Sequence, residues 1–405
     1  MNTSSTGRSG LDPAWLVVLA GVSAALHVGK LPPAIPVLRD ALGITLVQAG
    51  FLLSAVQVAG MLLGLLIGLM ADRIGLRRSM LLGLGVLAAA SMGGAFAAHA
   101  GVLLVLRAVE GLGFLMVVLP APSMIRRLVA PERMSRVLGL WGGYMPLGTA
   151  LALLAGPSFT ETWGWPAWWA ALGALSLLMW LWVARAVPPD GAAPVAAAGP
   201  RLAWTRPLRQ TLAAPGPWLV ALCFSVYAAQ WLSVVGFLPS IYREAGLAGA
   251  WVGVLTAAVA AINIVGNITA GRLLQAGWPP ARLLTLGFVA MALGATLAFA
   301  ATAEGVALPP AARYGAVLMF SCVGGLIPGT LFSLGVRVAP NDQTVATTIG
   351  WMQQWSAIGQ FAGPPVVAWV AVWAGGWRWT WVVTVGCAAV GLLLTARLQR
   401  LLQAR

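Results

Sequence analysis

The sequence predicts an all-α integral membrane protein whose twelve transmembrane helices form two pseudo-symmetric six-helix bundles. Three observations lead to this fold class. Hydrophobic residues make up 60% of the chain and charged residues 8%, whereas a soluble globular protein needs about a quarter charged residues at its surface. Apolar runs of about 20 residues, the length that crosses the hydrocarbon core of a bilayer, recur along the chain. The second half also repeats features of the first.

The apolar runs divide into two sets of six. In the first half they lie at residues 14–37, 46–70, 79–98, 102–125, 137–158 and 166–186. In the second half they lie at residues 217–240, 250–271, 282–302, 314–335, 345–372 and 378–396. The first run is longer than the core of a signal peptide, and no small-residue cleavage site follows it. We therefore expect it to be retained as a membrane span.

One connection is much longer than the others and divides the chain. Residues 187–216 begin with Pro188-Pro189 and continue through an alanine-rich stretch with several arginines. We therefore predict a first bundle at residues 1–186, a cytoplasmic linker at residues 187–216 and a second bundle at residues 217–405.

The two halves repeat in the same orientation. Trp15 matches Trp218 and Pro36 matches Pro239, both at an offset of 203 residues. A parallel repeat of six helices is typical of secondary transporters, whose binding site lies between the halves near the middle of the membrane.

The distribution of arginine predicts the orientation. The chain has 23 arginines, one lysine and a net charge of +14. If the N-terminus is cytoplasmic, eighteen arginines fall in cytoplasmic segments and only Arg39, Arg243, Arg313 and Arg378 fall in outer loops. By the positive-inside rule we predict a cell inner membrane protein with both termini in the cytoplasm. The excess charge then faces a lipid leaflet, which argues against nucleic-acid binding.

Lys30, the only lysine of the chain, lies inside the first apolar run. A charged side chain in this position costs about 2.5–3.5 kcal/mol on insertion scales and usually serves a function. His27 projects from the same helix face. Pro32-Pro33 then removes two backbone donors, which is tolerated at this depth only against protein or a water-filled cavity. We predict that His27 and Lys30 bind substrate; the alternatives are a core histidine and a lysine that reaches toward the membrane surface.

Arg107 and Glu110 lie three residues apart in the fourth apolar run and therefore share a helix face. Glu110 is the only carboxylate inside any predicted span, so we assign it to proton coupling, together with His27. We assign Arg107 to substrate binding. The alternative is a pair that only neutralises itself in lipid.

Neutral polar and aromatic groups in other spans complete the predicted substrate site. We assign to it Tyr144, Tyr227, Gln230, Trp231, Asn263, Gln353 and Gln354. Amides of this kind also hydrogen-bond one another between helices with a modest gain in stability, which is the structural alternative.

The loop Gly68-Leu69-Met70-Ala71-Asp72-Arg73-Ile74-Gly75-Leu76-Arg77-Arg78 resembles the signature G-x-L-A-D-R-x-G-R-R of the major facilitator superfamily. Arg107, Glu110, Gly111 and Gly113 are similar to its second motif, R-x-x-Q-G-x-G. The resemblance implies gating roles for Gly68, Asp72, Arg73, Gly75 and Arg77. In the family the aspartate docks on the start of helix 11, expected here near residues 342–347, and a carboxylate is stabilised at such a helix end.

Two further comparisons with family motifs bear on the substrate. Residues 237–242 (F-L-P-S-I-Y) and 351–354 (W-M-Q-Q) are similar to segments of the cyanate and nitrite-type anion permeases of the superfamily. The antiporter motif of the family is degenerate here, because Met145-Pro146 stands where Gly-Pro is expected. This difference weakens the interpretation as an exporter.

The leading hypothesis is an alternating-access secondary transporter for a small anion, coupled to protons or another gradient. The alternative is a proton-coupled exporter of amphipathic compounds, for which the Trp- and Met-rich interior and Glu110 could serve. An enzyme is not expected, because the sequence has no H-E-x-x-H motif, acid pair or nucleotide-binding loop.

We expect the partners to be a small solute, a coupling proton and the lipid bilayer, and the protein to be a monomer without a cofactor. Cys223, Cys322 and Cys387 lie in separate apolar runs and match neither a disulfide framework nor a zinc spacing. We therefore assign them to packing.

Overall fold

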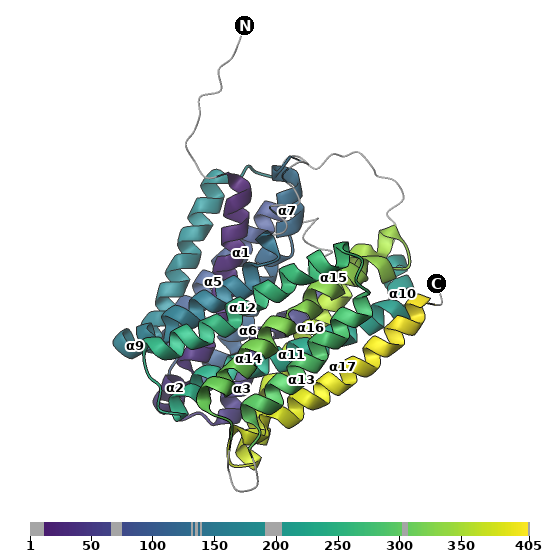
Figure 1. Ribbon diagram of the computed structural model, residues 1–405. Helices are drawn as coiled ribbons and strands as arrows, with labels where there is room; N and C mark the ends of the chain where they lie inside the picture. The colour runs from purple at the N-terminus through teal and green to yellow at the C-terminus, as the bar shows by residue number, and fades with distance from the viewer. Residues whose placement is uncertain are drawn as a thin grey trace.

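The computed structural model describes residues 12–65, 75–130, 133, 137, 140–190, 205–301 and 307–403, which Figure 1 shows as a set of long helices. Within these ranges the one backbone pairing of β type is a single bridge between Ala301 and Ala307. The chain is all-α, as predicted. We call the end of the molecule where α1 begins and α17 ends the terminal end, and the opposite end, where α2 ends and α9 turns, the distal end.

The helices of the first half mostly pair into membrane-spanning units. They are α1 (Pro13–Gly29), α2 (Leu31–Leu42), α3 (Leu46–Ala55), α5 (Leu76–Gly94), α6 (Ala100–Val118), α7 (Ala121–Leu128) and α9 (Tyr144–Ala186). α1 and α2 form one span, α6 and α7 form another, and the span that begins with α3 extends to Leu65. α9 holds two spans, because Gly164 (φ 80°, ψ 163°) turns the chain between them. This backbone region is open almost only to glycine.

The second half begins with a short helix and continues with six spans. Its helices are α10 (Thr205–Ala213), α11 (Pro215–Glu244), α12 (Ala250–Gln275), α13 (Pro280–Phe299), α14 (Pro310–Gly324), α15 (Leu326–Val338), η1 (Asp342–Thr344), α16 (Val345–Trp373), η2 (Trp377–Trp379) and α17 (Thr380–Gln403). α14 and α15 form one span. Proline occupies the first position of α11, α13 and α14, where its missing N–H would have no helical partner.

These helices supply the twelve predicted spans. Within the described ranges, nine helical stretches are long and apolar enough to cross a membrane, and one of them, Tyr144–Ala186, contains two spans. α5 and α16 supply the remaining two. The predicted fold class is therefore confirmed. The segment 187–216 is not a plain linker, because it contains α10 and the start of α11; the limits of the two domains stay a prediction.

The two bundles share an apolar core at the distal end. This core joins Leu53 of α3 and Trp168 of α9 to Phe237 of α11. The backbones also approach closely where α3 packs on α16, since a Cβ on Gly50 would lie 3.0 Å from the Cα of Pro365. Glycine makes such an approach possible. The distal end is therefore held together by packing between the bundles.

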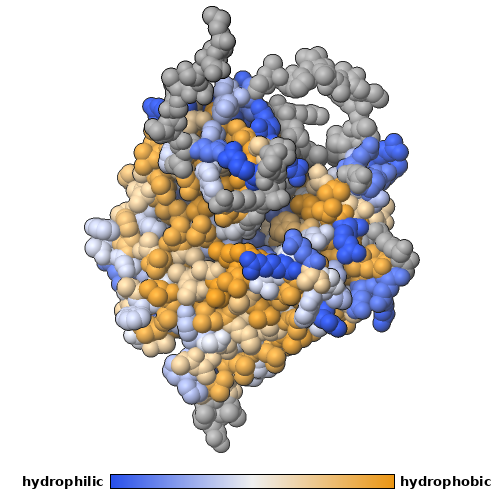
Figure 2. Space-filling model, turned by 45° about the horizontal axis from the view of Figure 1, so that its top comes forward, coloured by the Kyte–Doolittle hydropathy of each residue, from blue (hydrophilic) through white to orange (hydrophobic). Residues whose placement is uncertain are grey.

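The outer surface is apolar around the middle of the molecule. Large hydrophobic side chains such as Leu178, Leu293 and Leu393, which lie inside their spans, are exposed there. Figure 2 shows hydrophobic residues over much of the face that it draws and the most hydrophilic residues in its upper and right-hand parts. An extended apolar surface of this kind suits contact with lipid.

Candidate functional site

Four ionisable side chains of the first bundle meet in its interior, and we call them the buried ion cluster: His27, Lys30, Arg107 and Glu110. Each of the four residues is 0% exposed. His27 and Lys30 come from the junction of α1 and α2, whereas Arg107 and Glu110 come from α6. Buried charges are costly unless they are paired and hydrogen-bonded, so the partners of each group determine what the cluster can do.

Lys30 points into the first bundle rather than toward lipid or water. Its Nζ donates to Glu110 Oε1 and, at 2.8 Å, to the hydroxyl of Ser91 in α5. The same atom lies 3.4 Å from His27 Nδ1 and 4.6 Å from the centroid of the Trp169 ring. The ammonium group therefore has a counterion, further hydrogen-bond partners and an aromatic face.

Arg107 binds the same carboxylate through the other oxygen. Its Nη1 donates to Glu110 Oε2 at 2.7 Å and to the carbonyl oxygen of His27 at 2.6 Å. Its Nε lies 3.5 Å from the carbonyl oxygen of Leu52 in α3. The predicted i,i+3 pair is present, but Glu110 is shared between two cations. The Nη2 of Arg107 is buried and has no hydrogen-bond partner among the described residues.

The charges of the cluster do not balance. One carboxylate, Glu110, faces the two basic side chains Lys30 and Arg107. His27 lies at hydrogen-bond distance from the hydroxyl of Ser176 in α9, with 2.7 Å between Nε2 and Oγ. With His27 neutral and the other three groups ionised, the cluster carries one net positive charge. Among the described residues no second carboxylate forms a salt bridge with the cluster, and an uncompensated buried charge costs several kcal/mol.

The proline pair helps to build the cluster, because it interrupts the first span at Lys30. Pro32 and Pro33 lie in the first turn of α2 and cannot donate to the preceding turn. Side chains donate to carbonyls on both sides of the interruption. Arg107 binds the carbonyl of His27, and Trp168 Nε1 binds that of Lys30 at 3.1 Å. The break is thus stabilised by protein, which is the condition for a helix break at this depth.

A second polar group lies among α11, α12 and α14 of the second bundle. The amide nitrogen of Asn263 donates to the Tyr227 hydroxyl at 3.1 Å and to the carbonyl of Ser321 at 2.9 Å. Trp231 donates to the hydroxyl of Ser321 at 3.2 Å, and Asn267 donates to the side-chain oxygen of Asn263 at 3.1 Å. The structure therefore brings together Tyr227, Trp231 and Asn263 from the predicted site, in the opposite bundle from the ion cluster.

Gln230 stands in α11 at the position that the internal repeat relates to His27. Its side chain is buried, and neither its amide oxygen nor its amide nitrogen has a hydrogen-bond partner among the described residues. A buried amide without partners costs free energy. Both bundles therefore place a polar side chain at equivalent positions, but only the first bundle surrounds it with charge.

The remaining three predicted binding residues lie elsewhere. Tyr144 stacks on Trp141, with ring centroids 4.3 Å apart. Gln354 donates to the carbonyl of Met61 at 2.8 Å across the seam between α16 and the second span, and Gln353 is half-buried on α16. Their part in binding a solute stays a prediction.

Three of the predicted gating residues, Gly68, Asp72 and Arg73, lie outside the described residues. Gly75 precedes α5 with φ 98°, a conformation that favours glycine. Arg77 is fixed within its own bundle, because its Nη2 donates to the carbonyl of Ala184 at 2.6 Å. The helix on which the aspartate is predicted to dock is α16, which begins at Val345, within the expected residues 342–347.

Asp190 is a functional candidate that the sequence did not single out. It follows α9, and its carboxylate accepts hydrogen bonds from the backbone N–H of Arg77 at 3.0 Å, that of Arg78 at 3.1 Å and the side chain of Arg127 at 3.1 Å. Partial burial alone would raise the pKa of Asp190, but these three donors hold it below its usual value. The sequence feature that could have pointed to Asp190 is its position as the acidic residue of the arginine-rich segment 187–216.

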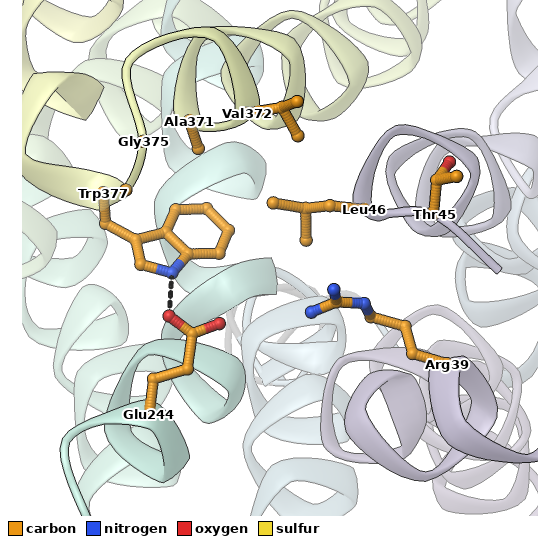
Figure 3. A pocket seen from close by; sticks show the side chains of 9 residues that line it. Arg39, Thr45, Leu46, Glu244, Ala371, Val372, Gly375 and Trp377 are labelled. Atoms are coloured by element: carbon orange, nitrogen blue, oxygen red, sulfur yellow. Dashed lines mark hydrogen bonds between the residues drawn. The ribbon is translucent and has the colours of Figure 1, made fainter. Parts of the chain in front are cut away.

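A pocket lies at the distal end across the seam between the bundles, and Figure 3 shows its lining. Arg39 and Leu46 line it from the first bundle, and Glu244 and Trp377 line it from the second. Its volume is about 440 Å³. The indole N–H of Trp377 donates to Glu244 at 2.7 Å. This pocket is separate from the buried ion cluster.

The described ranges form twelve spans in two related bundles, with an apolar outer surface and charged groups buried inside one bundle. These features define a multi-pass membrane transporter. The chain belongs to the Major Facilitator Superfamily, whose family profile matches residues 17–364. The resemblance seen in the sequence is therefore confirmed.

Two curated relatives match parts of the chain. The cyanate transport protein of Escherichia coli is 26% identical over 249 residues, which cover 60% of this chain and 61% of that protein. An uncharacterised MFS-type transporter of Mycobacterium tuberculosis is 30% identical over 129 residues, or 31% of this chain and 22% of that protein. The chain thus spans less than two thirds of the length of either relative.

Solved structures share the fold over nearly the whole chain. A bacterial homologue of the human lysosomal transporter Spinster, in an inward-facing and unoccupied conformation, aligns with a TM-score of 0.79 and 16% identity over 97% of this chain and 98% of that chain. The D-xylose-proton symporter aligns with a TM-score of 0.72 and 16% identity over 95% and 96% of the two chains. At these identities the likeness concerns the fold.

Proposed function

We propose that this transporter carries a small anion by alternating access, driven by protons or another ion gradient. The observation that carries the proposal is the unbalanced charge of the buried ion cluster. Lys30 and Arg107 share the one carboxylate of Glu110. A bound anion would supply the missing negative charge without requiring either basic side chain to leave its place.

Arg107 is the member of the cluster that we assign to the anion. Its Nη2 has no partner among the described residues, so it has a donor to spare. Its Nε lies against the carbonyl of Leu52 in α3, and α3 packs on α16 of the second bundle. In the same seam Gln57 donates to Gln360 at 3.0 Å. Separation of these helices would bring solvent and solute toward the arginine.

Glu110 provides a route to proton coupling. As a carboxylate it competes with an anion for both basic side chains, because it binds each of them directly. Protonation would weaken both contacts and free the two cations for the solute. A proton and a monovalent anion would then cross the membrane together without a net transfer of charge.

Two further observations support the proposal. One relative is a cyanate transport protein, and cyanate is a small anion. The arginines gather at the terminal end, where Arg126 and Arg127 lie in the last turn of α7 and Arg337 in that of α15. By the positive-inside rule we infer that the protein lies in a cell inner membrane with its terminal end facing the cytoplasm.

The neutral polar group around Asn263 would contact the solute from the second bundle.

Uptake of labelled cyanate, nitrate and short carboxylates into proteoliposomes tests the proposal. We expect Arg107→Gln and Lys30→Met to lower uptake about tenfold or more, the effect of losing a charge-assisted hydrogen bond. Arg282→Gln is the matched control, because Arg282 lies over the Trp278 ring, 5.6 Å from its centroid and apart from the cluster. Glu110→Gln should make uptake independent of an imposed pH gradient. Unchanged uptake of every anion by both cluster variants would refute an anion site here.

Export of amphipathic compounds is the second candidate, and one observation favours it. Trp218, Trp351 and Trp355 pack together with ring centroids 4.8–6.0 Å apart, and the indole N–H groups of Trp351 and Trp355 have no acceptor among the described residues. Lys30 and Arg107 already bind the carboxylate of Glu110, which argues against Glu110 as a free acid that could bind a cationic compound. Resistance to lipophilic cations that is lost with Glu110→Gln would favour this second function.

A further inference from the structure

We propose that the distal pocket binds a small zwitterion, with the anionic group on Arg39, the ammonium group on Glu244 and the apolar part against the Trp377 indole. These three side chains are not part of the proposed transport site, and the sequence predicted no binding role for them. Two sources share the required chemistry: a free amino acid and the headgroup of a phosphatidylethanolamine lipid.

The charges in the pocket explain why one ligand should carry both signs. In Figure 3 the guanidinium of Arg39 extends into the pocket from one wall and the carboxylate of Glu244 faces it from the other. No ion pair joins these two side chains among the described residues, and the Nε of Arg39 is shielded from solvent without an acceptor. A purely anionic or purely cationic ligand would satisfy one charge and be repelled by the other.

The neighbouring charges leave Arg39 and Glu244 as the groups available to the ligand. An adjoining pocket of about 110 Å³ shares both residues and adds Asp40, Ser240 and Arg243. Arg243 is engaged by Glu161 of the first bundle. Asp40 is exposed and lines the smaller pocket but not the larger one.

The remaining walls suit an apolar substituent. Leu46, Ala371 and Val372 line one part, and the Trp377 ring lines another. Gly375 and Gly376 adopt φ values of 67° and 142°, which glycine permits and which lead directly into Trp377. Because this turn fixes the indole while its N–H binds Glu244 at 2.7 Å, the apolar wall and the anionic group are held together. The volume of about 440 Å³ lies in the range of small-molecule sites.

The walls come from both bundles, so an occupant would connect them. Arg39 and Leu46 belong to the first bundle, whereas Glu244 and Trp377 belong to the second. A ligand that contacts both binds best when the distal end is closed, and it therefore favours that arrangement. Binding should raise the thermal stability of the whole protein.

Thermal unfolding of the purified full-length protein in lipid-free detergent tests the free-solute source. Leucine is the probe, and leucinamide and N-acetylleucine each lack one of its charges. We expect leucine to raise Tm at lower concentrations than either analogue. Arg39→Gln and Glu244→Gln should each raise the leucine concentration needed about tenfold or more, which corresponds to losing one charge-assisted hydrogen bond. Arg378→Gln is the control, because Arg378 is exposed beside Trp377 but does not line the pocket.

Nanodiscs of phosphatidylethanolamine and of phosphatidylglycerol test the lipid source with the same four proteins. Stabilisation by phosphatidylethanolamine that is lost in Arg39→Gln and Glu244→Gln supports a headgroup site, and stabilisation by leucine alone supports a free solute. Equal effects of leucine and its two analogues would overturn the proposal. So would normal responses of both pocket variants, or no response of the unmodified protein to leucine and to phosphatidylethanolamine. Each result is independent of whether the protein transports an anion.

Discussion

Glu110 stabilises the first bundle, because Lys30 and Arg107 both bind its carboxylate in the interior. We predict that Glu110→Gln lowers the free energy of unfolding by about 3–5 kcal/mol, the cost of leaving a buried charge without its partner. Unfolding of the purified variant followed by heat or denaturant measures the loss. An anion that binds the cluster should restore part of it.

The double variant Lys30→Met with Glu110→Gln separates this charge effect from a general loss of packing. It removes one charge of each sign, so it should be more stable than Glu110→Gln alone. A double variant that is less stable by the sum of the two single losses would show that Lys30 and Glu110 are not coupled.

The pairs in the cluster and their common site were expected from the sequence, but the residues that hydrogen-bond them from other helices were not. Helical spacing placed His27 beside Lys30 and Arg107 beside Glu110, and both contacts are present. The sequence does not say which face of one span packs on another. Ser91 accepts a hydrogen bond from Lys30, and Ser176 lies at hydrogen-bond distance from His27. In the sequence both serines look like ordinary small residues of apolar helices. The same uncertainty explains why Tyr144 and Gln354 were grouped with residues that they do not contact.

Gly164 divides α9 into two spans, and its backbone conformation (φ 80°, ψ 163°) is strained for any residue with a Cβ. We predict that Gly164→Ala lowers the free energy of unfolding by about 1–3 kcal/mol. Gly101→Ala in α6 is the matched control, because Gly101 is helical and a Cβ there would meet no atom within 4 Å. It should be neutral or slightly stabilising. Equal losses in the two variants would show that the turn at Gly164 is not the cause.

Asp190 caps the first turn of α5, where it accepts the N–H groups of Arg77 and Arg78. We predict that Asp190→Ala lowers the local stability of α5 by about 1 kcal/mol, as for other helix caps. Hydrogen exchange of the amides at the start of α5 measures this effect, and Asp190→Asn should restore part of the protection.

The effect of Asp190 should depend on pH in a defined direction. Its folded pKa lies below the usual value of 3.8, so its contribution is fully present above that value and is lost as the pH falls through the folded pKa. The difference in protection between the unmodified protein and Asp190→Ala should therefore be constant from neutral pH to about pH 5 and shrink in stronger acid. A difference that grows toward acid would contradict the cap.

The spans were predictable because length and hydropathy are properties of a single segment. α10 was not, because it is nine residues long and contains Arg206, Pro207 and Arg209 within a segment that the composition marked as a linker. Its formation depends on tertiary contacts, such as the hydrogen bond from the side-chain nitrogen of Asn341 to Gln210 Oε1 at 3.3 Å. Short helices of this kind gain their stability from packing and not from their own propensity.

A hydropathy pattern does not show which helices form the interface between the two bundles. The described hydrogen bonds that cross between them are few: Gln57 to Gln360, Gln354 to the carbonyl of Met61, and two contacts to Glu161. The family's rocking motion requires an interface of this kind, which packs well but is joined by few polar contacts. The equilibrium between its arrangements can therefore be shifted by a single pair.

The ion pair between Glu161 and Arg243 is the contact to change. At the distal end Glu161 Oε1 accepts from the Arg243 side chain and, at 3.2 Å, from the backbone N–H of Gly249, so it ties the first bundle to α11 and the loop after it. The two side chains are 26% and 30% exposed, and a partly exposed ion pair contributes about 0.2–1 kcal/mol. We predict that Glu161→Gln shifts the equilibrium toward an open distal end by up to about fivefold. Spin labels on α9 near Glu161 and on α12 near Gly249 would report the longer distance.

Two variants show whether that shift comes from the contact between bundles. Arg313→Gln removes a charge from the same end, but its described partner, the carbonyl of Ala298, lies in its own bundle, so the distance distribution should stay unchanged. Exchanging the charges, Glu161→Arg with Arg243→Glu, should restore part of the closed population, because the pair is rebuilt although the Gly249 contact is lost. If Glu161→Gln left the distribution unchanged, packing between α3 and α16 alone would keep the distal end closed.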